Sequence, residues 1–190
     1  MLDAVDRLLR AGATEDSLSM RAVAKEVGVS PPALYLHFAD KQELLYAVCE
    51  RHFHGLEAAM REETAGVDGP LEVIQGCGRA YVRFGLAHPE AYRMMFVSGA
   101  EAMQVSPEQV ADLVAFAFVL AAVEHALEAG AIAAADPVEV ALLLWTSVHG
   151  IVSLRLSKPD FPWPPLDDQL DHMLTTVGVG LTVPNTGTRS

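Results

Sequence analysis

The sequence predicts an all-α fold of about nine helices, and three observations lead to that prediction. Apolar residues recur at helical spacing along most of the chain, alternation of apolar and polar residues is absent, and helix-capping signals recur. Together these signals place the start and the end of each helix. The predicted helices span residues 1–12, 19–27, 31–37, 41–63, 70–87, 89–97, 107–129, 137–157 and 166–182.

The strongest local signals stand where the helices begin. A Ser or Asp side chain accepts a hydrogen bond from the first N–H groups of a helix, which have no partner inside the helix. A Glu or Gln three residues later, or a Pro at the first helical position, strengthens the signal. Residues of this kind are predicted to cap five helices: Ser19, Ser30, Asp40, Ser106 and Asp136.

Three later segments have distinctive compositions. Between Asp112 and Glu124 the sequence is apolar on every side, which predicts a central helix surrounded by neighbours. Residues 159–165 hold four prolines around Phe161 and Trp163, which predicts a stiff loop with Trp163 packed on the body of the protein. Residues 183–190 are small and polar, which predicts a disordered tail.

The patterns of several other protein classes are missing from the sequence. Cys49 and Cys77 lie among apolar residues and form no CxxC pair, which predicts buried free thiols. His52 and His54 are two residues apart and so point to different sides of a helix, and we expect neither a metal site nor a cofactor. The sequence contains no GxSxG, HExxH or Walker A motif, which argues against an enzyme.

No segment is predicted to enter a membrane. The first ten residues mix apolar and charged side chains at helical spacing, unlike a signal peptide. The longest uncharged runs, Leu113–Val123 and Val140–Leu154, are shorter than the ~18 residues that a membrane span needs. We therefore expect a cytoplasmic protein without a membrane partner.

A helix-turn-helix is predicted where the helices at 19–27 and 31–37 meet. Such a motif needs a small residue in its first helix, a glycine four residues later for a left-handed turn, and an apolar residue six residues further on. Ala24, Gly28 and Leu34 stand at these three places. Val23, Val27 and Val29 supply the apolar side that joins the two helices and leaves the other side of the second helix exposed.

The exposed side chains of this segment are predicted to divide between the phosphates and the bases of DNA. A glycine turn between amphipathic helices also occurs in ordinary bundles, but the aromatic and basic residues after this turn favour DNA binding. Ser30, His37 and Lys41 are expected at phosphates, and Arg21 and Lys25 at the flanking backbone. The residues expected to face base edges and thymine methyl groups are Pro31, Pro32, Ala33, Tyr35 and Leu36.

The distribution of charge agrees with a local DNA-binding surface. The net charge of −12 argues against a protein that coats nucleic acid without specificity. Residues 1–46 carry five basic and seven acidic side chains, whereas the remaining residues carry eight and eighteen. This asymmetry predicts a DNA-binding domain at 1–46 joined to an effector-binding and dimerisation domain at 47–182.

Three stretches of this chain resemble the N-terminal domain of the tetracycline-repressor family of bacterial regulators. They are SerMetArgAlaValAla, GlyValSerProProAlaLeuTyrLeuHisPhe and AspLysGlnGluLeuLeu, and the resemblance covers residues 1–47. It implies a DNA-binding part in a homodimer, with a helical domain that holds a small-molecule pocket. Trp145, His149 and Gly150 further resemble the signature of one C-terminal subtype. Members usually carry a basic tail before the first helix and an arginine or a bulky aromatic residue where this chain has Leu36.

Aromatic and methionine side chains mark the region expected to bind the effector. Such side chains form adaptable apolar walls, and a few polar groups would orient the ligand. Each of them, taken singly, also fits an ordinary core position. The candidates are Cys77, Tyr81, Phe84, Tyr92, Met94, Met95, Phe96, Met103, Phe116, Leu120, Trp145 and His149.

The last helix carries an apolar stripe that is predicted to form the dimer interface. Paired with the helix at 138–156, two copies would make a four-helix interface about a two-fold axis. The stripe consists of Leu166, Leu170, Met173, Leu174, Val177 and Leu181.

The function predicted from the sequence is that of a transcriptional regulator that responds to a ligand. We expect a repressor that binds a pseudo-palindromic operator as a homodimer and is released by a small apolar or amphipathic effector. The alternative is a helical small-molecule-binding protein whose DNA-binding part is weakened or lost.

Overall fold

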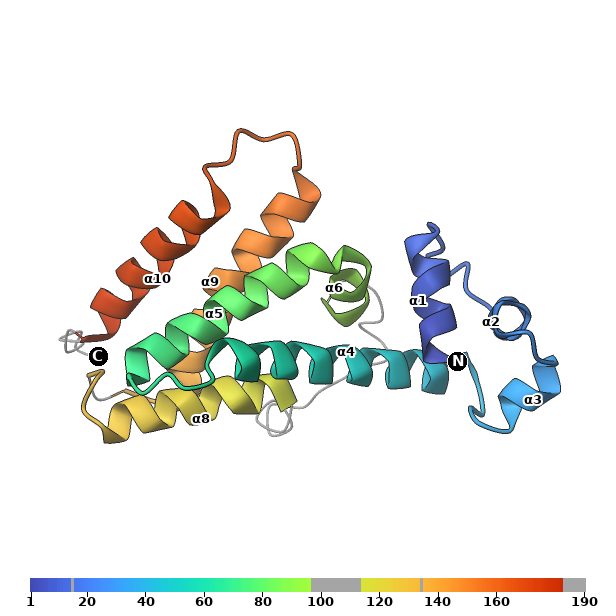
Figure 1. Ribbon diagram of the computed structural model, residues 1–190, viewed down its shortest axis with the longest axis horizontal. Coiled ribbons are helices and arrows are strands. Elements are labelled where there is room, and N and C mark those ends of the chain that lie inside the picture. Colours follow the sequence, from blue (N-terminus) through green and yellow to red (C-terminus); the bar gives the residue numbers. More distant parts are fainter. Residues whose placement is uncertain (15, 97–113, 134, 183–190) are drawn as a thin grey trace, which may run out of the picture. The chain divides into compact units, whose positions relative to one another are not determined.

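The structure is a computed structural model that describes residues 1–14, 16–96, 114–133 and 135–182 (Figure 1). The predictions for Met103, for the cap at Ser106, for residues 107–113 and for the tail at 183–190 lie outside these residues. The described residues form helices and no strand, which confirms the predicted all-α fold. The helices are α1 (Leu2–Arg10), α2 (Met20–Val27), α3 (Pro31–Tyr35), α4 (Lys41–Glu63), α5 (Pro70–Ala87), α6 (Pro89–Phe96), α8 (Val114–Glu128), α9 (Pro137–Ser157) and α10 (Leu166–Thr182).

The chain divides into two compact units. The first unit comprises Met1–Gly55 and His88–Ser106, and the second comprises Leu56–Ala87 and Pro107–Ser190. Helix α4 therefore supplies residues to both units. The sequence predicts a domain boundary after residue 46, whereas the first unit also includes the following turns of α4 and the whole of α6.

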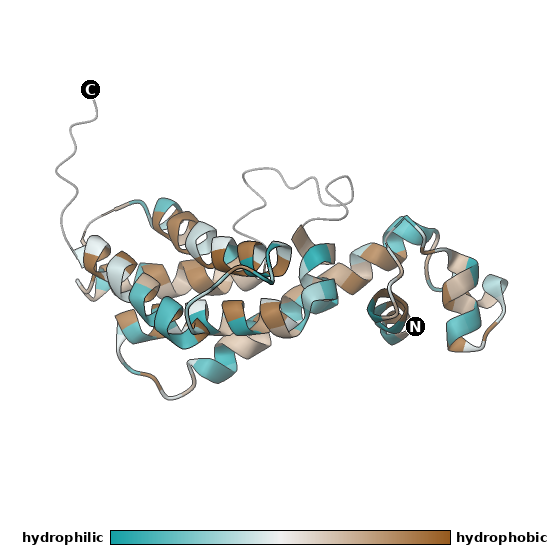
Figure 2. Cartoon of the chain, turned by 90° about the horizontal axis from the view of Figure 1, so that it is seen from above, coloured by the Kyte–Doolittle hydropathy of each residue, from teal (hydrophilic) through white to brown (hydrophobic). Residues whose placement is uncertain are grey.

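The core of the first unit consists of aliphatic side chains from α1 to α4. Val5, Val23, Leu34 and Val48 are fully or almost fully buried there, and Met94 of α6 joins them. These are the apolar positions of amphipathic helices, so the same residues that define the helices also hold them together. Figure 2 shows the result as a mixture of hydrophobic and hydrophilic residues on each helix.

Helix α6 is attached to the first unit by contacts between residues far apart in the sequence. Arg10 Nε of α1 lies 3.7 Å from Glu90 Oε1, and the Cys49 thiol donates to the Met94 carbonyl at 3.6 Å. Cys49 and Cys77 are both buried free thiols, as predicted.

The second unit is built on contacts between α5, α8 and α9, with α10 packed on α5. Val123, Ala126 and Ala141 are fully buried in this core. Helix α10 approaches α5 closely because Gly78 has no side chain. A Cβ atom at Gly78 would lie 2.7 Å from Leu174 Cδ2, so even an alanine would force Leu174 to move.

The proline-rich loop between α9 and α10 is fixed by Arg155 and Trp163, which confirms the predicted packing of Trp163. The Arg155 guanidinium lies over the Trp163 ring at 5.5 Å and donates to the Pro164 carbonyl at 2.7 Å. The Trp163 indole N–H donates to the Lys158 carbonyl at 2.9 Å, and the Phe161 ring lies 4.6 Å from the Trp163 ring.

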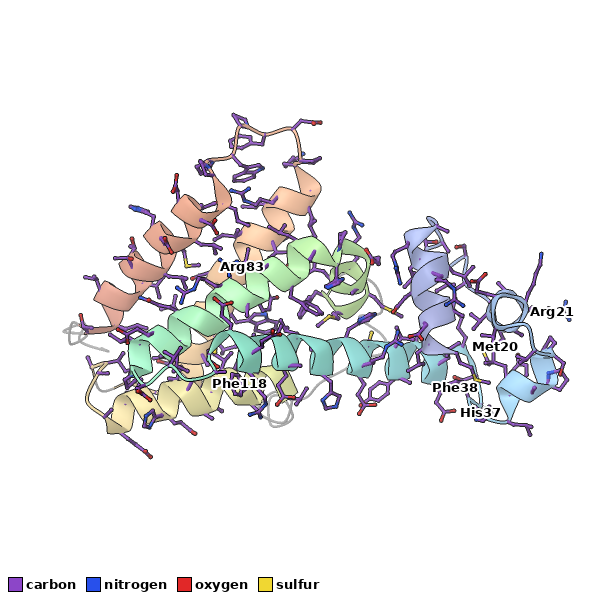
Figure 3. The ribbon with its side chains drawn as sticks, in the orientation of Figure 1. Met20, Arg21, His37, Phe38, Arg83 and Phe118 are labelled. Atoms are coloured by element: carbon purple, nitrogen blue, oxygen red, sulfur yellow. The ribbon has the colours of Figure 1, made fainter. Side chains whose placement is uncertain are left out.

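The prediction that the helix containing residues 114–124 is surrounded on every side is wrong. Ala121 of α8 is exposed. The Phe118 ring, labelled in Figure 3, lies 4.7 Å from the Arg61 guanidinium, so a cation covers that face instead of an apolar neighbour. An apolar sequence shows that a helix avoids charge, but it does not show how many neighbours the helix has.

Helix α9 keeps one apolar face exposed in the single chain. Leu142, Leu143 and Leu154 lie on this face, and Val138 is exposed near the start of the helix. Among the described helices α9 is long and apolar enough to span a membrane, but a core helix of a soluble protein passes the same test of length and composition. Contiguous exposed apolar surface often marks an interaction site, so this face is a candidate contact surface.

Candidate nucleic-acid interface

The turn between α2 and α3 has the geometry predicted for a helix-turn-helix. Gly28 ends α2 in the left-handed conformation, with φ of 82°. The Val29 N–H donates to the Ala24 carbonyl at 2.9 Å, and the Gly28 N–H donates to the Lys25 carbonyl at 3.2 Å. This pair of bonds is a Schellman motif, which satisfies the last carbonyls of the helix and turns the chain sharply. Leu34 is 0% exposed, so α3 is held firmly on α2.

The cap of α2 is confirmed, but the predicted side-chain cap of α3 is not formed. Ser19 Oγ accepts a hydrogen bond from the Ala22 N–H at 3.2 Å, whereas the Ser30 side chain accepts none from α3. Pro31 and Pro32 have no N–H group, so only the Ala33 N–H is left for such a cap. The first N–H of α3 belongs to Ala33, and it donates to the Ser30 backbone carbonyl at 3.0 Å.

Two consequences follow for phosphate binding at this end of α3. The exposed Ser30 hydroxyl is not used as a cap, so it remains a candidate phosphate contact. The helix end itself offers fewer donors than an ordinary helix N-terminus, because the two prolines supply none. Backbone N–H groups at the start of α3 therefore contribute little to the predicted phosphate contacts.

Helix α3 ends at Tyr35, two residues before the predicted end. The His37 and Phe38 N–H groups both donate to the Leu34 carbonyl, at 3.0 and 3.1 Å, and close a tight turn. Phe38 packs against the buried core of the first unit, so it draws the chain away from the helix axis. The turn leaves Leu36 85% exposed beyond the end of the helix.

The residues predicted to face DNA bases differ in how much surface they offer. Tyr35 is 52% exposed, and Pro32 is exposed as well. Pro31 and Ala33 are half-buried against the unit. The side chains that stand out from the unit are therefore Pro32, Tyr35 and Leu36.

The basic side chains predicted to contact phosphates lie around this helix. Arg21 and Lys25 are exposed on α2, and His37 is exposed after α3; Figure 3 labels Arg21 and His37. Lys41 is the first residue of α4 and is half-buried. A nearby unpaired carboxylate would weaken the attraction of these cations for phosphate, so the partners of the neighbouring acidic residues decide how strong that attraction is.

The acidic residues closest to these cations in the sequence are engaged elsewhere. Glu26 of α2 forms an ion pair with Arg7 Nε of α1 at 2.6 Å. Asp40 accepts from the Glu43 N–H at 2.9 Å, which confirms the predicted cap, while the Glu43 carboxylate accepts from the Ala39 N–H, one residue before the position that a standard capping box uses. This cap also fixes the start of α4.

Helix α1 is tied to α4 through Asp6. The Arg51 guanidinium donates to Asp6 Oδ2 at 2.6 Å, and His52 Nε2 lies 3.0 Å from Asp6 Oδ1. Burial alone raises the pKa of Asp6, but the hydrogen bond and charge of His52 and the charges of Arg51 and Arg10 outweigh it. The pKa of Asp6 therefore lies below its ordinary value, which keeps the carboxylate charged.

In the second unit, four of the predicted effector-binding residues form a cluster. Trp145 Nε1–H of α9 donates to Tyr81 Oη of α5 at 3.2 Å, and Tyr81 Oη lies 2.9 Å from His149 Nδ1. The Phe116 ring of α8 packs edge-on against Trp145, at 6.1 Å between centroids. Burial lowers the pKa of His149, so the imidazole is neutral at pH 7.

The direction of these hydrogen bonds follows from the donors available. An indole N–H can only donate, so the Tyr81 oxygen accepts from Trp145. We assign the Tyr81 proton to the bond with His149 Nδ1, which places the imidazole proton on Nε2. Nearby, burial raises the pKa of the Cys77 thiol to about 11, so this group is also uncharged.

The remaining predicted effector residues are spread over both units. Phe84 and Leu120 are half-buried in the second unit, and Cys77 is buried there. The residues of α6 belong to the first unit, where the Phe96 ring contacts Tyr92 at 5.1 Å. Those residues are Tyr92, Met94, Met95 and Phe96. Their role in effector binding stays a prediction.

The apolar stripe of α10 faces the interior of its own subunit. Leu170 is 0% exposed and Leu174 is 4% exposed, so neither offers surface to a partner, and we remove both from the predicted dimer interface. Val177 and Leu181 pack against the buried core of the second unit. Leu166 and Met173 are half-buried. An apolar stripe indicates that one face of the helix is buried. It does not show whether the core of the same chain or a second subunit buries that face.

An exposed apolar face lies on α9, the helix at 138–156 that the sequence analysis pairs with the last helix in the predicted dimer interface. It combines exposed leucines with small residues, and Gly150 stands among them. A Cβ atom at Gly150 would meet nothing within 4 Å, so the space beside it is open in the single chain. The signal for this face was present in the sequence, because the helix at 137–157 is apolar on more sides than one core can cover.

Two domain families match different parts of this chain, one at each end. Residues 74–177 match "Tetracyclin repressor-like, C-terminal domain", and residues 15–48 match "Bacterial regulatory proteins, tetR family". The HTH-type transcriptional activator FasR of Mycolicibacterium smegmatis is 31% identical over 77 residues, which make up 40% of this chain and 35% of that relative. The chain thus spans about a third of the length of the curated relatives it matches.

Solved structures with the same fold cover nearly the whole chain. A protein of unknown function from Rhodococcus sp. RHA1 is 29% identical, with 96% of this chain and 93% of that chain covered and a TM-score of 0.81. A TetR family transcription regulator from Marinobacter aquaeolei VT8 is 21% identical, with 95% and 92% covered and a TM-score of 0.73. The second likeness concerns the fold alone.

Proposed function

Because this chain belongs to the tetracycline-repressor family of bacterial regulatory proteins, we propose that it is a DNA-binding transcriptional regulator controlled by a small ligand. In this proposal it is a cytoplasmic repressor that binds a pseudo-palindromic operator as a homodimer. It is not an enzyme, in keeping with a family of regulators. The resemblance of its C-terminal part to the Trp-His-Gly subtype stays a prediction.

The observation that carries the proposal is the exposed end of the helix-turn-helix. A Schellman turn holds α3 on α2 through a fully buried Leu34, and Tyr35 and Leu36 project from the unit. The cations Arg21 and Lys25 flank this helix on α2. A rigid helix end with uncharged readers and flanking cations fits the major groove, where the cations meet phosphates and the readers meet base edges.

The homodimer is supported by the exposed apolar face of α9. Leu142, Leu143 and Leu154 would lose contact with water against a second copy of the same face, and Gly150 would let the two helices approach closely. A homodimer supplies two copies of α3, one for each half of a symmetric DNA site.

A substitution at Gly150 tests this interface without disturbing the single chain. In Gly150→Leu the new side chain enters open space, so the monomer should keep its thermal stability while the close approach of two copies is blocked. The matched control is Ala121→Leu at an exposed position of α8. Sedimentation velocity should show a dimer for the control and monomer for Gly150→Leu. A dimer of unchanged affinity in Gly150→Leu would place the interface elsewhere.

The effector in this proposal is a small molecule with an apolar body and few polar groups. Its site includes the cluster of Tyr81, Trp145 and His149, whose groups are uncharged at pH 7. An uncharged site suits an uncharged ligand, because a buried ion without a partner is costly. Binding would release DNA if the ligand favours a state in which the two α3 helices do not match the operator.

Selection of binding sites from random DNA tests the proposal as a whole. The full chain, selected with and without a panel of apolar metabolites, should enrich a pseudo-palindrome and should lose it in the presence of one of them. Enrichment of no sequence would contradict DNA binding. In that case ligand binding detected by thermal shift would favour a ligand-binding protein without DNA activity.

A further inference from the structure

We propose that this protein recognises its operator through the 5-methyl groups of pyrimidines, which Leu36 contacts as the principal reader. This inference rests on the proposed DNA-binding function and specifies what the reading helix detects. It also implies that 5-methylcytosine can replace thymine as a contact, because both bases carry a methyl group at C5 in the major groove.

The first support is the inventory of side chains at the reading end of α3. Base-specific hydrogen bonds come mainly from Arg, Lys, Asn, Gln, Asp or Glu, whereas Ser and Thr can contact any base and discriminate little. None of these residue types occurs between Ser30 and Leu36. The exposed readers are Pro32, Tyr35 and Leu36, and among them only the Tyr35 hydroxyl can form a hydrogen bond.

The second support is the position of Leu36. Its side chain is 85% exposed, more than any other large apolar residue described as exposed, although an apolar side chain gains free energy by leaving water. The early end of α3 at Tyr35 places Leu36 just beyond the helix, where it is far more exposed than the half-buried Ala33 and Pro31. An exposed leucine at this place has an apolar partner in the major groove, namely the methyl group of thymine.

The third support is the rigidity of the helix that Leu36 directly follows. Pro31 and Pro32 fix the backbone of the first turn of α3, and Leu34 is fully buried in the core of the first unit. A helix held in this way loses little conformational entropy on binding. One methyl contact of ordinary strength therefore suffices to affect affinity, at about 4-fold for one buried carbon group.

The Tyr35 hydroxyl provides the competing explanation. It could read the O4 atom of thymine by a hydrogen bond, and a preference for thymine alone would not distinguish O4 from the methyl group. Four pyrimidines separate the two features. Thymine has both, uracil has only O4, 5-methylcytosine has only the methyl group, and cytosine has neither.

The experiment measures the affinity of the full chain for operators that carry each of these four bases at one position. The operator is the sequence enriched by selection. Each pyrimidine position of one half-site carries the four bases in turn, each paired with its matching purine in the opposite strand. Binding is followed by fluorescence anisotropy at fixed salt. At the contacted positions, uracil should bind about 4-fold more weakly than thymine, and cytosine about 4-fold more weakly than 5-methylcytosine.

Two variants assign this effect to a side chain. Leu36→Ala should reduce both methyl ratios to about one, and it should fold normally because Leu36 is mostly exposed. Tyr35→Phe removes the hydroxyl alone and should leave both ratios unchanged. A thermal melt of each variant checks that the fold is kept.

Three outcomes would overturn the inference. Equal affinity for thymine and uracil at every position would show that no methyl group is read. Methyl ratios that persist in Leu36→Ala would assign the readout to another residue, and ratios that disappear in Tyr35→Phe would assign it to the hydroxyl. If selection enriches no DNA at all, the proposed function fails together with the inference, and this result is distinct from the other three.

Discussion

Replacing Tyr81 by phenylalanine should destabilise the second unit by about 1–3 kcal/mol. The Tyr81 hydroxyl takes part in two hydrogen bonds, one from Trp145 at 3.2 Å and one with His149 at 2.9 Å. A hydrogen bond contributes about 0.5–1.5 kcal/mol net to stability, and both are lost in Tyr81→Phe while the ring is retained. Tyr81 is 4% exposed, so water cannot easily replace its hydroxyl.

Urea denaturation of the full chain at pH 7.5 and one fixed protein concentration measures this difference. The concentration must be fixed because dimer formation also contributes to stability. The matched control is Tyr46→Phe, which removes a hydroxyl from a tyrosine that is 52% exposed and should change stability by less than about 0.5 kcal/mol. A change below about 0.5 kcal/mol in Tyr81→Phe as well would refute the view that this network supports the unit.

Three further predictions concern the turn, the phosphate contacts and pH. Gly28→Ala should cost about 1–2 kcal/mol of stability in urea denaturation, because its φ of 82° is unfavourable for a side chain; the exposed Gly180→Ala, without a positive φ, is the control, and equal losses would contradict this explanation. Lys41→Ala should lower the slope of log affinity against log salt by about one, whereas Lys158→Ala in the α9–α10 loop should not; an unchanged slope would remove Lys41 from the interface. Burial lowers the pKa of His149, so as the pH falls below 6.5 the unfolded chain takes up this proton before the folded protein does. The free energy of unfolding should therefore be full above pH 6.5 and decrease below it until the folded protein is protonated too. His149→Gln should reduce the loss of stability between pH 7.5 and 5.5, whereas His125→Gln, at an exposed position, should not.

The sequence predicts those parts of the fold that depend on neighbouring residues. Asp40 and Asp136 accept hydrogen bonds from N–H groups two or three positions later, so a short pattern is enough to place the start of α4 and α9. Gly28 is a similar case, because only a local left-handed turn is needed to end α2.

The parts that could not be predicted depend on what each surface meets. The double proline leaves Ala33 as the first N–H donor of α3, and this N–H donates to the Ser30 carbonyl instead of the side chain. Phe38 packs into the core and ends α3 early. The placement of α6 depends on a contact between Cys49 and Met94, forty-five residues apart. Leu170 and Leu174 form a stripe that fits a dimer interface, but the subunit core covers it. Periodicity identifies a covered face and gives no information about its partner.

The central claim is that this chain reads a two-fold symmetric DNA site through α3. The most direct test is selection from random DNA with the full chain, followed by measurement of the number of chains bound to the enriched site by sedimentation with labelled DNA. We predict a pseudo-palindrome whose half-sites lie one helical turn of DNA or a multiple apart, with one chain for each half-site and with lost affinity when Tyr35 and Leu36 are both replaced by alanine. An enriched site without symmetry, or unchanged affinity of the double variant, would contradict the claim.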